Sequence, residues 1–148
     1  MPLALVSLMF VTALVPVAQK AVPIGGPLAA AQAIRCSFRS FAATEWKDGQ
    51  TETVVHPQEF VFQVDTINIK KRTGRFVVGT ASVPVSVFLT QTGLDIIEQT
   101  PLGNFILTSV FAAGGAAGAF PAIHSRHLGD LATPPSASQH FGTCEIQK

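Results

Sequence analysis

Residues 60–111 form a run of short segments in which apolar and polar residues alternate, with turn-forming residues between them. In residues 82–90, for example, Val83, Val85 and Val87 occupy every second position. A repeat of two places these side chains on one face of a β-strand, whereas a helix needs a repeat of about 3.6 residues. The segments are short and their turns are tight. They therefore predict an antiparallel meander of successive hairpins.

Two irregularities and one turn are expected inside this meander. The apolar positions of residues 60–69 change face at Asp65 and Thr66, which predicts a β-bulge. Pro84 has no backbone N–H, so it indicates an edge position or a bulge. The polar residues 70–74 predict a turn in which Gly74 is able to adopt a positive φ.

The flanking sequence continues the same pattern on both sides of the meander. Four further strands are expected, over residues 37–44, 51–55, 120–128 and 138–146, with a turn over residues 45–49. Residues 112–119 are small and predict a loop. The fold class is therefore all-β, a single antiparallel meander barrel or a β-sandwich of about eight strands.

The first 33 residues differ in composition from the rest of the chain. Residues 3–17 are almost wholly apolar and have the length of a signal-peptide core. Ala31 and Ala33 flank Gln32 in the small-x-small pattern of a cleavage site, so we expect a signal peptide over residues 1–33, cleaved after Ala33. The β domain would then span residues 34–148, and an uncleaved N-terminal anchor is the alternative. Either way, contact with a membrane is expected only through this export segment.

The two cysteines, Cys36 and Cys144, stand near the two ends of the expected domain. In an exported chain they predict one disulfide, which would hold the first strand beside the last. Two free thiols or a redox pair are the alternative, although the Cys-x-x-Cys spacing of redox pairs is absent from the sequence. The disulfide and the leader together predict a periplasmic or secreted protein.

The charge balance limits the possible partners. Without Lys20, the Lys and Arg residues equal the nine Asp and Glu residues in number. A neutral domain lacks the field that gathers nucleic acid, so no nucleic-acid partner is expected. The basic residues Lys70, Lys71, Arg72 and Arg75 cluster at a predicted hairpin turn, which favours a solvated turn over a binding patch.

The densest group of polar side chains is His124, Ser125, Arg126 and His127. On a strand, His124 and Arg126 share one face while Ser125 and His127 share the other, so the two histidines would not meet on one metal ion. We therefore assign no catalytic residue, metal ligand or cofactor. Instead, Arg126 is expected to pair with a carboxylate such as Glu98. The eleven Phe residues are expected mainly in the core, and a surplus would line a cavity for a small apolar ligand.

Several strings in the chain resemble a group of small exported bacterial proteins of unknown function. They are GLDIIEQT at residues 93–100, HSRH at residues 124–127 and SQHFGTC at residues 138–144. The resemblance implies export and a compact domain, and it implies no activity. We thus expect a non-enzymatic binding or structural protein of the cell envelope, with a small apolar ligand or a protein as partner. The alternatives are a small barrel that inhibits a secreted protease, and a metal-binding protein or hydrolase centred on residues 124–127.

Overall fold

The structure is a computed structural model, and it describes residues 24–114 and 118–148. A short 3-10 helix precedes nine strands, and the strands follow one another as antiparallel neighbours. The elements in chain order are η1 (Gly26–Ala30), β1 (Ile34–Lys47), β2 (Gln50–His56), β3 (Phe60–Asn68), β4 (Thr73–Val78), β5 (Ala81–Leu89), β6 (Gly93–Gln99), β7 (Phe105–Phe111), β8 (Ala119–Leu128) and β9 (Ser136–Ile146).

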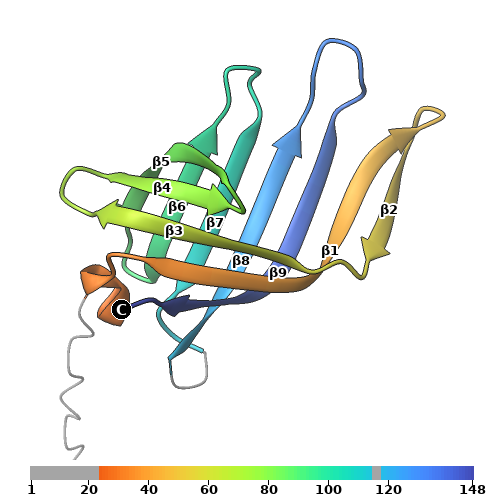
Figure 1. Cartoon of the computed structure of the whole chain (residues 1–148). Coiled ribbons are helices and arrows are strands. Elements are labelled where there is room, and N and C mark those ends of the chain that lie inside the picture. Colours follow the sequence, from red (N-terminus) through yellow and green to blue (C-terminus); the bar gives the residue numbers. More distant parts are fainter. Residues whose placement is uncertain (1–23, 115–117) are drawn as a thin grey trace, which may run out of the picture.

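The sheet closes on itself, because β9 also pairs with β1 (Figure 1). This pairing makes a closed barrel of eight antiparallel strands, in which β2 is an extra strand attached only to β1. The predicted all-β fold is confirmed, and of the two predicted architectures the chain adopts the barrel. Closure pairs the edge of β9 that an open sheet would leave exposed, while the outer edge of β2 stays unpaired among the described strands.

The long strand β1 makes the two ends of the barrel different. Its first part pairs with β3 from Ile34 to Phe38, and its second part pairs with β2 from Phe41 to Lys47. Its register with β9 shifts between Phe38 and Phe41, as at a β-bulge. The hairpins β1–β2, β6–β7 and β8–β9 all extend toward the same end of the molecule (Figure 1). We call this end the rim.

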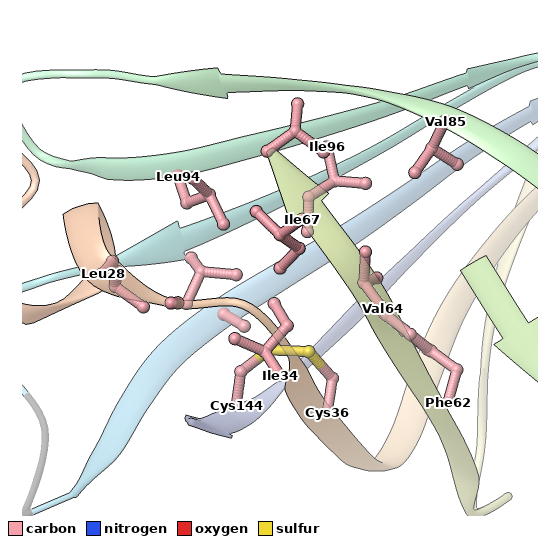
Figure 2. Close-up of a cluster of buried hydrophobic side chains, with 14 of the residues drawn as sticks. Leu28, Ile34, Cys36, Phe62, Val64, Ile67, Val85, Leu94, Ile96 and Cys144 are labelled. Atoms are coloured by element: carbon pink, nitrogen blue, oxygen red, sulfur yellow. A yellow bond between two sulfur atoms is a disulfide. The ribbon is translucent and has the colours of Figure 1, made fainter. Parts of the chain in front are cut away.

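The predicted disulfide joins Cys36 and Cys144. The two residues lie directly opposite each other on β1 and β9, and both are fully buried. The bond therefore crosses the pair of strands that closes the barrel. Figure 2 shows the disulfide beside Ile34, and it belongs to the same buried cluster as apolar side chains of β3, β5 and β6.

Helix η1 covers the end of the barrel opposite the rim. Leu28 and Ala31 are buried with the barrel core, and the Gln147 N–H donates to the Ala33 carbonyl oxygen at 2.9 Å. Residues 24–33 belong to the predicted signal peptide, and residues 1–23 lie outside the described part. Cleavage after Ala33 stays a prediction, and it would remove two core side chains from this end.

Of four local features predicted from the sequence, the structure confirms two and differs from the other two. The register of β3 with β4 shifts between Asp65 and Asn68, as the predicted bulge requires, and Pro84 lies in the part of β5 that pairs only with β4. Gly74, however, is not the turn residue. It lies within β4, where a Cβ would be 3.0 Å from a methyl carbon of Val87, while Arg72 has the positive φ of 57°.

The other difference concerns the tip of the first hairpin. The predicted turn over residues 45–49 is shorter in the structure, because β1 continues through Trp46 and Lys47. Only Asp48 and Gly49 form the turn, with φ values of 51° and 79°. Two central residues with positive φ are typical of the type I′ turn, which matches the twist of a hairpin.

Gly142 is expected to be essential for closure of the barrel. A Cβ at this position would overlap the carbonyl oxygen of Ser37 and lie 3.0 Å from the Cα of Phe38. Both atoms belong to β1, so Gly142→Ala should push the closing strands apart and lower the free energy of unfolding by about 2–3 kcal/mol in a urea titration. Gly129→Ala is the control, since its Cβ would meet nothing nearer than 3.8 Å. Equal stability of the two variants would contradict the expectation.

Candidate functional site

One row of inward-facing side chains crosses the sheet between the core and the rim. Its members lie opposite one another in register from strand to strand, and they are Val87, Ile96, Thr108, His124, His140, Phe41 and His56. The row thus brings three histidines from three different strands onto one face. Two of them, His124 and His140, are buried, while His56, the last residue of β2, is exposed.

His124 is the more deeply buried member, with 1% of its surface exposed. Its Nδ1 shares a hydrogen bond with the hydroxyl of Thr108 at 2.8 Å, and its ring contacts Phe60 and Phe62 with centroid separations of 5.3 Å. Burial, together with the charges of His140 and Arg126, lowers the pKa of His124 to about 3. The imidazole is therefore neutral at physiological pH.

His140 packs between two rings. It stacks on Phe41 at 4.7 Å and meets His124 edge-on at 5.3 Å. Both of its ring nitrogens are buried and have no hydrogen-bond partner among the described residues. Burial and the nearby charge of Arg126 lower the pKa of His140. A neutral imidazole in this place acts as an aromatic filler of the core.

The remaining predicted site residues are spread over both faces of the sheet. Arg126 is half-buried on the inner face and lies opposite Ser138. Ser125 is half-buried on the outer face, and His127 is exposed there, 6.4 Å from the ring of Phe105. The predicted alternation of residues 124–127 between the two faces is therefore what β8 shows.

The expected ion pair between Arg126 and Glu98 does not form. Both residues lie opposite Ile106, so one whole strand separates them, about 9–10 Å in a β-sheet. The ion pairs of the described residues are Lys47–Glu52 at 3.1 Å and Arg75–Asp65 at 2.8 Å. Sequence order alone did not reveal that β7 would lie between the two groups.

The surroundings of the histidines of β8 and β9 show which other reactive side chains lie near them among the described residues. Among residues 24–114 and 118–148, no group of three or more His, Cys, Asp or Glu side chains could hold a metal ion. Ser125 is on the face opposite to His124, so β8 does not bring a hydroxyl nucleophile to that imidazole. The arrangement supports packing and gives no support to a hydrolase centred on residues 124–127.

A different feature, an open groove at the rim, was not predicted from the sequence. It has a volume of about 630 Å³ and is bordered by the tips of the hairpins β1–β2, β6–β7 and β8–β9. Each tip contributes one exposed apolar side chain. These are Trp46, Leu102 and Leu131, with 52%, 75% and 109% of their surfaces exposed. The sequence signal was an apolar residue in or beside three segments of turn-forming residues, at 45–49, 101–104 and 129–137.

Hydrogen bonds hold two of these tips in place. The Asn104 carboxamide oxygen accepts the Gly129 N–H at 2.8 Å, which joins the β6–β7 turn to the β8–β9 loop. The Asp130 carboxylate accepts the N–H groups of Ala132 and Thr133 at 2.7 Å. These bonds lower the pKa of Asp130, so its charge persists in mild acid. Leu131 therefore stands exposed on a loop with internal support.

Comparisons with known protein families, with curated proteins and with solved structures give no match for this chain. In the described part of the chain, none of the helical structure is long and apolar enough to cross a bilayer.

The candidate site is thus the rim groove, and the predicted polar group lies mostly elsewhere. Of the five predicted polar residues, only His127 borders the groove. A second, smaller cavity of about 240 Å³ lies beside the β1–β2 ribbon. Neither cavity is lined by Phe, so the expected Phe-lined pocket for an apolar ligand is not among them.

Proposed function

We propose that this chain is a non-enzymatic binding protein that holds a protein partner in the rim groove. The observation that carries the proposal is the meeting of Trp46, Leu102 and Leu131 around one groove. Each comes from a different hairpin, and each is at least half exposed. Exposed apolar side chains that gather in this way mark interaction surfaces more often than isolated ones do.

The charges around the groove specify the chemistry of the partner. The lining includes the carboxylates Glu45 and Asp130, and none of the lining residues is Lys or Arg. A complementary partner therefore offers apolar side chains flanked by Lys or Arg. An extended segment suits the open shape, because it presents alternate side chains to the groove and to solvent.

The protease-inhibitor hypothesis and the expected location fit within this proposal, whereas the enzyme, metal and apolar-ligand hypotheses gain no support. An inhibitor of a secreted protease would be one special case, in which the partner is the protease. A place in the periplasm or outside the cell suits the buried Cys36–Cys144 bond, since disulfides persist in oxidising compartments. The enzyme and metal hypotheses would need convergent groups around His124, and the apolar-ligand hypothesis would need an enclosed Phe-lined cavity.

Trp46 provides a direct test, because it is the only Trp of the chain and lines the groove. Its fluorescence should shift to shorter wavelength when an acetylated Lys-Leu-Lys-Leu-Lys peptide is added, because binding removes the indole from water. The matched Glu-Leu-Glu-Leu-Glu peptide should give no shift, since its charges repel Glu45 and Asp130. Binding should weaken as the salt concentration rises to about 0.5 M, where such charges are screened.

Variants on the two sides of the molecule localise the binding. Leu131→Ser should weaken binding of the basic peptide about tenfold, which corresponds to the loss of about half of a buried leucine side chain. Val83→Ser is the control, because Val83 is exposed on β5 and does not border the groove. Equal binding of the two peptides, or equal loss in the two variants, would overturn the proposal.

A further inference from the structure

The outer edge of β2 is a second surface that can pair with another strand. In the described part of the chain β2 pairs only with β1, and all of its residues from Gln50 to His56 are exposed. Figure 1 shows the strand at the outside of the rim with no neighbour on its far side. Such an edge presents unpaired N–H and C=O groups along its length.

The register of the hairpin identifies which backbone groups are free. Because Asp48 and Gly49 form a two-residue turn, Lys47 and Gln50 are the first hydrogen-bonded pair. Alternation along an antiparallel ladder then gives outward-facing N–H and C=O groups to the residues Thr51, Thr53 and Val55. The 2.9 Å contact between the hydroxyls of Thr44 and Thr53 agrees, because side chains are closest in a pair without backbone bonds.

This edge lacks the features by which strands usually avoid pairing. Its register with β1 runs without a bulge from Gln50 to His56, and this span has neither Pro nor Lys. Its one formal charge, on Glu52, is matched by Lys47 at 3.1 Å. Val54 and Val55 are 44% and 68% exposed. The strand therefore has a continuous register, a charge matched by its neighbour β1 and exposed apolar side chains, which favours pairing with another strand.

We propose that β2 pairs antiparallel with β2 of a second copy of this chain, about a two-fold axis at Thr53. In that register Thr53 lies opposite Thr53 of the second copy, and Thr51 lies opposite Val55. All outward-facing backbone groups of both strands are then bonded within the pair, and the β-branched side chains meet across it.

The two neighbouring registers are less stable than this one. A shift of one residue toward the turn places Glu52 opposite Glu52, and like charges directly opposite destabilise a sheet. A shift of one residue away from the turn moves the axis to Val54. Thr51 then lies opposite Pro57, which has no N–H to donate. The axis at Thr53 instead sets Glu52 opposite Val54. The charges and the hydrogen bonds therefore select the same register.

Sedimentation velocity of the disulfide-bonded protein, from micromolar to near-millimolar concentration, tests the proposal. The expected result is a concentration-dependent mass twice that of one chain. Thr53→Pro should raise the dissociation constant at least about tenfold, because it removes an outward N–H that β1 does not use. Thr53→Val keeps that N–H and should dimerise like the wild type.

Hydrogen exchange of the wild-type protein gives a second measurement that does not depend on how the proline variant folds. The amides of Thr51, Thr53 and Val55 should become protected as the concentration rises, and those of Glu52 and Val54 should not change. A protein that stays monomeric over the whole range overturns the proposal, and it leaves the edge for a strand of another protein. A dimer without this protection pattern also overturns it.

Discussion

Replacing both Cys36 and Cys144 by Ala is expected to lower the free energy of unfolding by about 4–5 kcal/mol. The two residues are 108 positions apart, so the bond closes nearly the whole domain into one loop. Opening that loop lets the unfolded chain sample many more conformations, and the unfolded state gains entropy. The effect is larger than the one expected for Gly142→Ala. It amounts to a large part of the stability of a typical domain.

Urea titration at pH 7 of the oxidised protein, the reduced protein and the double Ala variant separates the contributions. The reduced protein retains both sulfur atoms, so its loss of unfolding free energy measures the contribution of loop closure alone. Any additional loss in the Ala variant reports the packing of side chains that are fully buried. Reductant should not change the Ala variant. A loss below about 1 kcal/mol on reduction would mean that the unfolded chain keeps its two ends together.

The second large effect is a loss of stability in acid, centred on His124. Its pKa is about 3 in the folded state and 6.5 in its ordinary state. Between these values the unfolded chain binds a proton that the folded barrel does not, so stability falls as the pH falls. Above about pH 6.5 this effect is absent. At pH 4 it lowers the free energy of unfolding by about 3 kcal/mol. The pKa of His140 is lowered as well, so it adds to the loss in the same direction.

The unfolding free energy measured from pH 7 to pH 4 checks this expectation. Each buried histidine should contribute a slope of at most about 1.4 kcal/mol per pH unit. His140→Phe should reduce the slope, because a phenyl ring keeps the stack on Phe41 and binds no proton. His127→Phe is the control, since His127 is exposed on the outer face. A flat profile in the wild type would show that the folded barrel accommodates charged imidazoles.

Local features of the fold were predictable because local patterns cause them. The alternation in residues 82–90 and the change of face at Asp65 each require only a few neighbouring residues. The Cys36–Cys144 bond could be predicted from composition and position alone. Gly74 was misassigned, because its role depends on contact with Val87 on the next strand. No local pattern contains that information.

The candidate site was less predictable, for a physical reason. The groove exists because three turns, far apart in the sequence, project from the same end of a closed sheet. Trp46, Leu102 and Leu131 each look like isolated exceptions among turn-forming residues until the register brings them together. Conversely, His124 and Arg126 looked chemically promising, but the barrel buries the first among aromatic rings and separates the second from Glu98.

The double role of β1 has a consequence for the order of folding. All pairings from β3 to β9 join strands that are neighbours in the chain, so they can form by local zipping as each hairpin is completed. The pairing of β1 with β9 joins the two extremes of the domain and has the largest loop-closure entropy to overcome. We therefore expect this pairing to form last, and it places Cys36 directly opposite Cys144, which favours formation of the disulfide. Until this step, β1 and β9 each have an unpaired edge that can associate with a strand of another chain. Closure of the barrel removes both edges at once.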